Sequence, residues 1–342
     1  MNILRRSLAL LSCFAVLSLQ LSSAGGAGSA PSPVKQATYT NPVLNENVPD
    51  PFVLPSGGQF YLYVTNGGGY NVPVYVSSDL VHWRVQGDAL PEQPSWASPG
   101  LTWAPEVMAF GNNRYVLYYT THDAASGKQC VGAAVATRPA GPYTDRSAHP
   151  IVCQAALGGS IDPSPFQDVD GQRYLLWKND GNCCAQPTRL YIQPLSADGL
   201  SLRGTPSALI ANDQPWEGAV VEAPTLHRAG GAYYLLYSGG SYNDGSYAVG
   251  YATSPHLLGP YRKADPNPLV VTKGAAVGPG HQSVVRDAAG QDWLVYHAWT
   301  AGAVGDGYGE RSLRIDRITF QGGKIRFGGP TVTPQMAPAG RP

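Results

Sequence analysis

Charged residues are scarce in this sequence. Only 13% of the 342 residues are Asp, Glu, Lys or Arg, and the 23 basic residues balance the 23 acidic ones. Helix-rich proteins depend on residues such as Lys and Glu, so this composition disfavours a helical fold. No basic stripe runs along the chain, which argues against nucleic acid as a partner and favours a neutral substrate.

Long apolar runs are missing beyond the N-terminus, so no membrane span is expected there. The N-terminus has two arginines, Arg5 and Arg6, followed by a mostly apolar stretch over residues 7–21 and small residues up to Ala24. This pattern is typical of a secretory signal peptide over residues 1–24, although a buried N-terminal helix is the alternative. It predicts a secreted or periplasmic protein that does not associate with the membrane after cleavage.

Cysteine is rare, with five in the chain. Cys13 lies within the predicted signal and is lost with it, unless it is the anchor of a lipoprotein, which is an alternative interpretation. An even number remains in an exported protein, which suggests disulfides among Cys130, Cys153, Cys183 and Cys184. Three pairings are possible, and one of them leaves Cys183 and Cys184 as a vicinal pair or as free thiols. Paired C-x-x-C spacing is absent, which argues against a zinc site.

Glycine, proline and aromatic residues are abundant instead. The chain has 41 Gly, 30 Pro, 20 Tyr and 7 Trp. Many turns and many aromatic side chains predict β structure with short strands. Apolar residues make up 43% of the chain, enough to bury a sizeable core.

Five similar units follow one another along the chain. Each begins with a short segment that contains an acid or a histidine, usually beside proline, and an aromatic-rich strand follows after a turn. These acid or histidine positions are 56, 56, 60 and 59 residues apart: Asp50, Glu106, Asp162, Glu222 and His281. Each unit also contains a second hairpin, which gives about four strands per unit.

Four-stranded sheets repeated around an axis form a β-propeller. The sequence therefore predicts an all-β, five-bladed β-propeller over residues 38–342, after a flexible Gly- and Ser-rich leader over residues 25–37. A pair of β-sandwiches is the alternative, but it would not require near-constant spacing. Because the first strand of each blade lines the central channel, the five repeat positions are expected to form a ring around the axis.

A ring of carboxyl groups suits hydrolysis of a glycosidic bond. Clustered carboxylates repel one another, which keeps at least one of them protonated at neutral pH. The reaction needs one protonated acid to release the leaving oxygen and one ionised acid to activate water or to attack directly. Aromatic faces can pack on sugar rings, and Trp103 beside this ring is a candidate for substrate binding.

Five segments carry a resemblance to a known family: Val48-Pro-Asp50-Pro-Phe, Trp103-Ala-Pro-Glu106-Val, Ile161-Asp162-Pro-Ser-Pro, Val221-Glu222-Ala-Pro and Gly280-His281-Gln-Ser-Val. In this order and spacing they resemble glycoside hydrolase family 43, from about Tyr39 to the end of the last blade. The resemblance implies a five-bladed propeller and an inverting mechanism with three acids. It implies that Asp50 is the general base, that Glu222 is the general acid, and that Asp162 orients the acid and raises its pKa.

The same resemblance implies further roles. Glu106 would have a structural or hydrogen-bonding role. His281 would lie near a calcium or other ion in the channel, coordinated largely by water, and no organic cofactor is expected. Arg311 would contact the sugar, with Arg314 as the alternative match. His297, which ends an aromatic strand, can also approach the channel.

The family contains α-L-arabinofuranosidases, β-xylosidases and endo-arabinanases that act on plant cell-wall polymers. Many of the β-xylosidases carry a further C-terminal β-sandwich, for which this chain has no room after the last blade. The expectation is therefore an exported, monomeric α-L-arabinofuranosidase whose partner is a carbohydrate substrate. A carbohydrate-binding propeller without activity is the alternative from another class, although the presence of all three acids argues against it.

Overall fold

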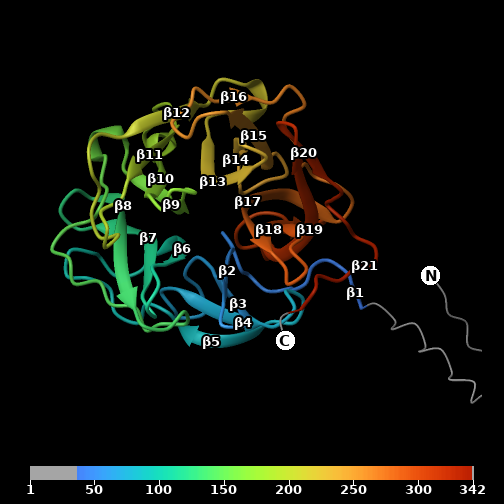
Figure 1. Cartoon of the computed structure of the whole chain (residues 1–342), viewed down its shortest axis with the longest axis horizontal. Coiled ribbons are helices and arrows are strands. Elements are labelled where there is room, and N and C mark those ends of the chain that lie inside the picture. The colour runs from blue at the N-terminus through green and yellow to red at the C-terminus, as the bar shows by residue number, and fades with distance from the viewer. Residues whose placement is uncertain (1–36, 341–342) are drawn as a thin grey trace, which may run out of the picture. The chain divides into compact units, whose positions relative to one another are not determined.

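The computed structural model describes residues 37–340, which form five blade sheets around a central axis and one further two-stranded sheet (Figure 1). This arrangement confirms the predicted all-β, five-bladed β-propeller. The predicted signal peptide, residues 1–24, and nearly all of the leader lie outside the described residues. Within residues 37–340 the helices are single 3₁₀ turns, η1 (Ala155–Leu157), η2 (Gly181–Cys184) and η3 (Pro215–Glu217), and none is long and apolar enough to cross a membrane.

The strands of each blade are antiparallel and follow one another in chain order. Blade 1 contains β2 (Phe52–Ser56), β3 (Gln59–Tyr63), β4 (Pro73–Ser77) and β5 (Arg84–Asp88). Blade 2 contains β6 (Trp103–Ala109), β7 (Tyr115–Asp123) and β8 (Lys128–Ala136). Blade 3 contains β9 (Ser160–Gln167), β10 (Arg173–Asn179), β11 (Arg189–Pro194) and β12 (Ser207–Ala211). Blade 4 contains β13 (Val221–Ala229), β14 (Ala232–Gly239), β15 (Ala248–Ser254) and β16 (Arg262–Lys263). Blade 5 contains β17 (Ala276–Arg286), β18 (Asp292–Thr300), β19 (Ser312–Gln321) and β20 (Lys324–Phe327).

Blade 2 differs from the predicted pattern of about four strands per unit. In place of a fourth strand, two isolated antiparallel pairings join Val135 of β8 to Thr144 and Val131 of β8 to Val152. The other four blades have four strands each.

The core is divided among the gaps between neighbouring blades. Strand β18 shows why: Trp293 and Val295 pack toward blade 1, whereas Leu294 and Tyr296 pack toward blade 4. Successive side chains of a strand point to opposite faces, so a continuous apolar run fills both gaps beside its blade. Five buried apolar clusters fill the five gaps in this way.

The first and last strands of the described residues pair beside blade 5. Strand β1 (Thr38–Tyr39) pairs with β21 (Gln335–Met336), close to the place where blades 1 and 5 meet (Figure 1). The Asn41 amide and the Tyr39 hydroxyl both donate to the carbonyl oxygen of Ile315 on β19. These contacts tie the segment that leads into blade 1 to blade 5 and so close the ring.

The inner edge of each blade contains a residue in the left-handed backbone region. These residues have φ values of 58°, 45°, 56°, 52° and 47°, in chain order Asp50, Ala104, Asp162, Ala223 and His281. The ladders of blades 2 to 5 shift register at or next to this point, which marks a β-bulge. A bulge adds one residue to a strand and re-aims the side chains beside it.

The bulge corrects the predicted ring of five equivalent positions. Asp50, Asp162 and His281 are equivalent, but Glu222 precedes the bulge residue of its blade and Glu106 follows its own by two. The strand pairing shows the same offset. Glu222 lies opposite Ser238, whereas Glu106 lies opposite Tyr118, two residues before Thr120, the counterpart of Ser238 in blade 2. The predicted equivalence is therefore wrong for Glu106 and Glu222, since residue spacing alone does not reveal where a bulge falls, but Glu222 still faces the central cavity.

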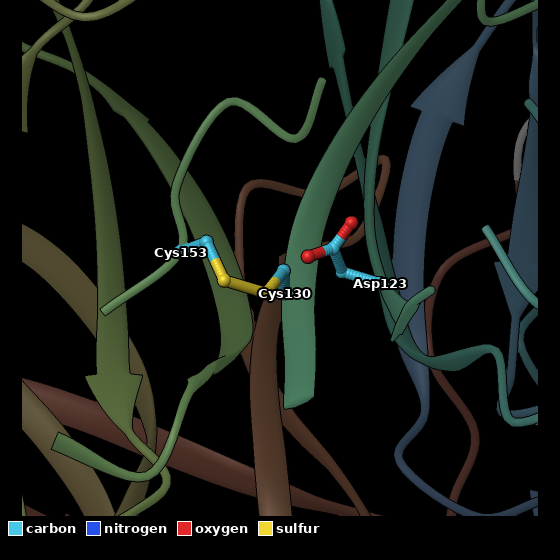
Figure 2. Close-up of side chains that lie close together, drawn as sticks. All are labelled: Asp123, Cys130 and Cys153. Carbon is cyan, nitrogen blue, oxygen red and sulfur yellow. A yellow bond between two sulfur atoms is a disulfide. The ribbon is translucent and has the colours of Figure 1, made fainter. Parts of the chain in front are cut away.

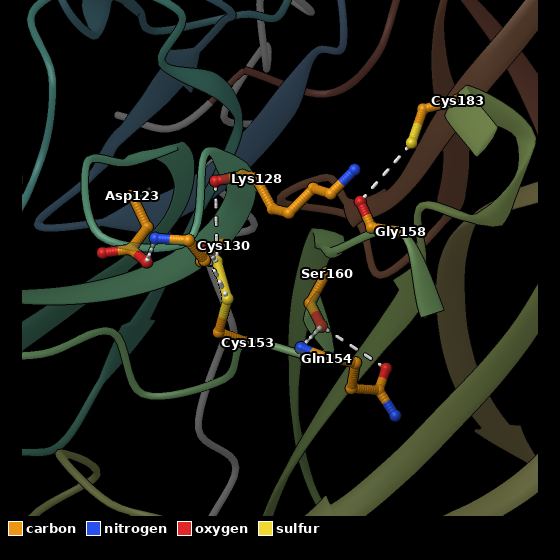
Figure 3. The surroundings of a disulfide bond; sticks show 9 residues. Asp123, Lys128, Cys130, Cys153, Gln154, Gly158, Ser160 and Cys183 are labelled. Atoms are coloured by element: carbon orange, nitrogen blue, oxygen red, sulfur yellow. Dashed lines mark hydrogen bonds between the residues drawn. A yellow bond between two sulfur atoms is a disulfide. The ribbon is translucent and has the colours of Figure 1, made fainter. Parts of the chain in front are cut away.

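The structure pairs the four cysteines as Cys130–Cys153 and Cys183–Cys184. Figure 2 shows the first of these disulfides beside Asp123. Ligand atoms of Asp123, Cys130 and Cys153 lie within 4.8 Å of one another. The two sulfurs are bonded to each other, so they offer no thiolate to a metal, and the carboxylate of Asp123 accepts the backbone N–H of Ser126. Figure 3 shows Cys183 of the second disulfide beside Gly158, to whose carbonyl oxygen its sulfur is close.

Candidate functional site

A cavity of about 740 Å³ is lined by residues from all five blades. Every residue predicted for the site contributes to its lining: Asp50, Trp103, Asp162, Glu222, His281 and Arg311. They lie between 50 and 311 in the sequence, so only the closure of the propeller brings them together. Glu106 is not part of this lining.

A ring of polar contacts holds the bulges around the cavity. Each blade has a polar side chain at the same level of the repeat, within the second strand or, in blade 1, two residues after it: Thr65, Thr120, Lys178, Ser238 and His297. In four blades it accepts the backbone N–H of the bulge residue in the next blade. These contacts are Ala104 to Thr65 Oγ1 at 2.9 Å, Asp162 to Thr120 Oγ1 at 3.2 Å, His281 to Ser238 Oγ at 2.9 Å and Asp50 to His297 Nδ1 at 3.0 Å.

Blade 3 departs from this pattern. Lys178 occupies the position of the acceptor, and an ammonium group cannot accept a hydrogen bond. The N–H of Ala223 is bonded instead to Asp162 Oδ2 at 2.9 Å. Lys178 Nζ donates to Glu222 Oε2 at 2.8 Å. Asp162, Lys178 and Glu222 therefore form one buried polar group between blades 3 and 4.

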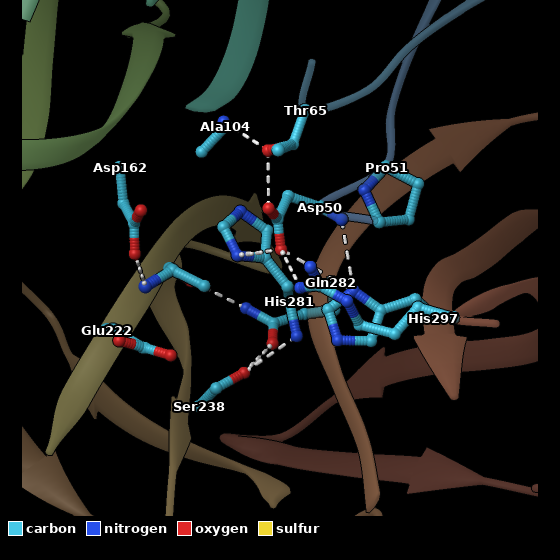
Figure 4. A network of polar contacts seen from close by, with 12 residues as sticks. Asp50, Pro51, Thr65, Ala104, Asp162, Glu222, Ser238, His281, Gln282 and His297 are labelled. Carbon is cyan, nitrogen blue, oxygen red and sulfur yellow. Dashed lines mark hydrogen bonds and ion pairs between the residues drawn. The ribbon is translucent and has the colours of Figure 1, made fainter. Parts of the chain in front are cut away.

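Asp50 is surrounded by basic and hydroxyl side chains (Figure 4). Thr65 Oγ1 donates to Asp50 Oδ2 at 2.5 Å, while His281 Nδ1 and Arg311 Nη1 lie 3.2 Å and 3.5 Å from Asp50 Oδ1. Burial alone would raise the pKa of Asp50, but the nearby His281 and Arg311 outweigh it and lower that pKa to about 2. Asp50 is therefore ionised across the physiological range.

His297 contacts the backbone of Asp50. Burial, reinforced by the charge of Arg311, lowers the pKa of His297 well below its ordinary value. The imidazole is therefore neutral, which is why its Nδ1 can accept the N–H of Asp50.

Asp162 and Glu222 titrate as a pair. Burial and the charge of Glu222 raise the pKa of Asp162 to about 6, against the opposing effects of His281 and Lys178. Burial would also raise the pKa of Glu222, but Lys178 outweighs it and, with a hydrogen bond from Tyr247, lowers that pKa. The hydroxyl of Tyr247 donates to Glu222 Oε1 at 2.6 Å. Below about pH 6 the pair therefore holds a proton, and Asp162 is the more basic of the two carboxyls. The expectation that Asp162 raises the pKa of Glu222 is wrong, because Lys178 lowers that pKa.

Glu106 has a different environment from the acids of the cavity. Its position in the blade corresponds to Ser164, Thr225 and Ser283. Thr225 and Ser283 donate to backbone carbonyls of the next blade, and Glu106 likewise hydrogen-bonds to Ser164 of blade 3. Burial raises the pKa of Glu106 well above its ordinary value, so it is a neutral contact between blades.

The two arginines of blade 5 are distinguished by their surroundings. Arg311 lines the cavity, with its guanidinium over the rings of Tyr242, at 4.9 Å, and Trp299, at 5.8 Å. Arg314 is 1% exposed, pairs with Tyr296 across the sheet, and does not line the cavity. Arg311 is thus the arginine that can reach a sugar.

A family model described as glycosyl hydrolases family 43 matches residues 39–325. The chain belongs to this family. It is therefore a glycosidase, an enzyme that hydrolyses bonds between sugars.

Individual family 43 members are similar over most of the chain. The crystal structure of a thermostable family 43 glycoside hydrolase is 33% identical, with a TM-score of 0.80 over 88% of this chain and 99% of that one. A β-D-galactofuranosidase of Aspergillus niger is 27% identical over 75% of both chains. A non-reducing end α-L-arabinofuranosidase of Bacteroides ovatus is 29% identical over 76% of this chain, which spans 47% of the length of that relative.

An ion near His281 would find few protein ligands. Calcium prefers six to eight oxygen ligands. Within residues 37–340, the cluster at Asp123 is the one group of three acidic, histidine or cysteine ligand atoms close enough to hold a metal, so His281 belongs to no such cluster. One imidazole nitrogen of His281 already faces Asp50. With His281 as the protein ligand, the site fits only an ion that is held mainly through water.

Two residues that contact Glu222 were missed by sequence analysis, Lys178 and Tyr247. Lys178 could have been found, because it replaces the Thr, Ser or His that follows the aromatic run at the same point of the other blades. Tyr247 has no such signal, since it precedes β15 in a segment without a repeat counterpart and is one of 20 tyrosines.

Proposed function

We propose that this protein is an exported, inverting glycosidase that removes α-L-arabinofuranosyl groups from plant cell-wall polysaccharides or their oligosaccharides. The observation that carries the proposal is the contrast between two acid groups in one cavity. Asp50 is held ionised, whereas the pair of Asp162 and Glu222 retains a proton up to about pH 6. Carboxyls whose pKa values are pushed apart in this way can divide the work of base and acid.

In the proposed reaction, Asp50 accepts a proton from a water molecule as the water oxygen attacks the anomeric carbon. Glu222 gives a proton to the glycosidic oxygen as the bond between that oxygen and the anomeric carbon breaks. Asp162 shares the proton of the pair with Glu222 and so keeps the acid supplied. One water is consumed, and attack from the face opposite the leaving group inverts the configuration.

Arg311 and Trp103 are proposed to bind the sugar. Both line the cavity, and Arg311 Nη1 lies 3.5 Å from Asp50 Oδ1. A guanidinium beside the base can donate hydrogen bonds to sugar hydroxyls, and an indole face can pack on the apolar face of the ring.

The substrate is argued from the relatives. The proteins from Aspergillus niger and Bacteroides ovatus are both named for the release of furanosides, a galactofuranoside and an arabinofuranoside. A five-membered pentose ring is the substrate that we favour for this chain. A β-xylosidase or an endo-α-1,5-arabinanase activity is the alternative within the family.

Parallel assays test the substrate. We expect release of 4-nitrophenol from its α-L-arabinofuranoside at least about tenfold faster, in kcat/KM, than from its β-D-xyloside, since about 1.4 kcal/mol of preference gives that ratio. Proton NMR of the arabinofuranoside reaction should show the β anomer first. Faster cleavage of the xyloside would reassign the substrate, and initial formation of the α anomer would exclude inversion. No cleavage of either glycoside or of arabinan would favour the binding propeller.

Export is proposed from the predicted signal over residues 1–24. N-terminal sequencing of protein recovered outside the cytoplasm should begin at Gly25. Recovery of the intact N-terminus inside the cell would contradict it.

Calcium near His281 is also a proposal, with the ion held mainly through water. Chelation with EDTA is expected to lower the melting temperature or the activity, and calcium should restore it. The matched variant His281→Gln should lose that response. A chelator effect equal in both proteins would place the ion elsewhere, and no effect in either would remove the proposal.

A further inference from the structure

Lys178 is a buried cation in contact with Glu222. Its side chain is 0% exposed, and its ammonium lies 2.8 Å from Glu222 Oε2 and 3.9 Å from Asp180 Oδ1. Burial would lower the pKa of this lysine, but Glu222, Asp162 and Asp180 outweigh burial and raise it, so the ammonium remains charged.

The fold does not call for a lysine at this position. The corresponding residues of the other blades are smaller acceptors, among them Thr65 and Thr120, and they satisfy a backbone N–H of the next blade. The blade that follows Lys178 is blade 4, and the corresponding N–H there, that of Ala223, already donates to the carboxylate of Asp162. Lys178 thus contributes nothing to the backbone ring, and a buried ammonium is costly unless it is compensated. Its ammonium contacts the carboxylates of Glu222 and Asp180.

We propose that Lys178 is a positioning residue that holds the pair of Asp162 and Glu222 at one shared proton and aims the Glu222 carboxyl at the leaving oxygen. This inference rests on the proposed role of Glu222 as proton donor. Two neighbouring buried carboxyls without a cation would retain their last proton to higher pH, because burial and mutual repulsion both disfavour the charged form. The ammonium opposes both effects and fixes one oxygen of Glu222, while Tyr247 fixes the other.

His281 also lowers the pKa of both carboxyls, but Lys178 is in direct contact with Glu222. The charged or titratable side chains that act on the two carboxyls are Lys178, Asp180, Tyr247, His281 and Asp50. Asp180 and Asp50 are acids, and the tyrosine hydroxyl is neutral. His281 is held beside Asp50, with its Nδ1 3.2 Å from Asp50 Oδ1. Lys178 is the cation whose contact with Glu222 the structure shows.

The test is the pH dependence of kcat/KM in Lys178→Met. We expect the alkaline limb, which reports loss of the proton of the pair, to move to higher pH by about one unit or more, because an adjacent opposite charge shifts a carboxyl by about that amount. The value of kcat at the optimum should fall by roughly tenfold, since the acid is less well oriented, while KM changes little. Lys178→Arg, which keeps the charge, should leave the limb near its original position.

Two further variants separate this effect from a loss of stability. Lys178→Thr introduces the residue that the first two blades carry, so it should fold and should shift the limb in the same direction. Lys263→Met removes a buried lysine paired with Asp213 and Glu217, residues that do not line the active cavity. It should lower the melting temperature without moving the limb.

An alkaline limb that stays in place in folded Lys178→Met or Lys178→Thr would overturn the inference. A shift in Lys263→Met equal to that in Lys178→Met would do the same. The assay of Glu222→Gln keeps the two proposals apart. If Glu222→Gln does not lose activity selectively on substrates with poor leaving groups, the proposed role of Glu222 as acid is wrong. If it does, and the alkaline limb of Lys178→Met is unmoved, only the proposed role of Lys178 is wrong.

Discussion

Asp50→Asn is expected to lower kcat/KM by on the order of 10³-fold for natural and activated substrates alike. The carboxylate of Asp50 is the group that the cavity keeps ionised, through His281, Arg311 and the hydroxyl of Thr65. The amide of asparagine retains the shape and can still accept from Thr65, but it cannot take a proton from water. Attack of the activated water is part of the same step as departure of the leaving group, so a better leaving group does not replace the base.

Glu106→Gln is the matched control for Asp50→Asn. Glu106 is a buried acid of the same repeat, but it is neutral, contacts Ser164 and does not line the cavity. Replacement by glutamine should leave kcat/KM within about twofold, because the isosteric amide substitutes for a protonated carboxyl. Loss of activity in Glu106→Gln equal to that in Asp50→Asn would show that the assay reports damage to the fold.

Glu222→Gln is expected to discriminate between leaving groups. A 2,4-dinitrophenolate leaves without protonation, so its arabinofuranoside should be cleaved within roughly tenfold of the wild-type rate. A natural oligosaccharide, whose sugar alkoxide leaves poorly, should lose on the order of 10³-fold or more. Steady-state kinetics on both substrates check this, and an unchanged melting temperature shows that the contacts of the side chain with Lys178 and Tyr247 are not needed for folding.

The fold could be predicted because propellers repeat their sequence as well as their structure. Five near-equal spacings of acids and aromatic strands identify five blades. The alternation within a strand such as β18 identifies which side chains fill the two neighbouring gaps. The missing fourth strand of blade 2 could not be predicted, since the isolated pairing of Val135 and Thr144 depends on where a loop lies.

The site was predictable to a similar extent. Convergence of Asp50, Asp162 and Glu222 on one cavity follows from the blade repeat, although the bulges that place Glu222 one residue before the others do not show in the spacing. The pKa of each acid depends on contacts across blades, above all those made by Lys178 and Arg311. Such contacts form only when the ring closes, and no local pattern encodes them.

The central claim is that Asp50 is the base and Glu222 the acid of an inverting glycosidase. The most direct test is the ratio of kcat/KM for the dinitrophenyl glycoside to that for the natural oligosaccharide, measured in Asp50→Asn and Glu222→Gln side by side. We predict that this ratio rises by about two orders of magnitude or more in Glu222→Gln and stays at its wild-type value in Asp50→Asn. A ratio that rises in Asp50→Asn and not in Glu222→Gln would mean that the two roles are reversed.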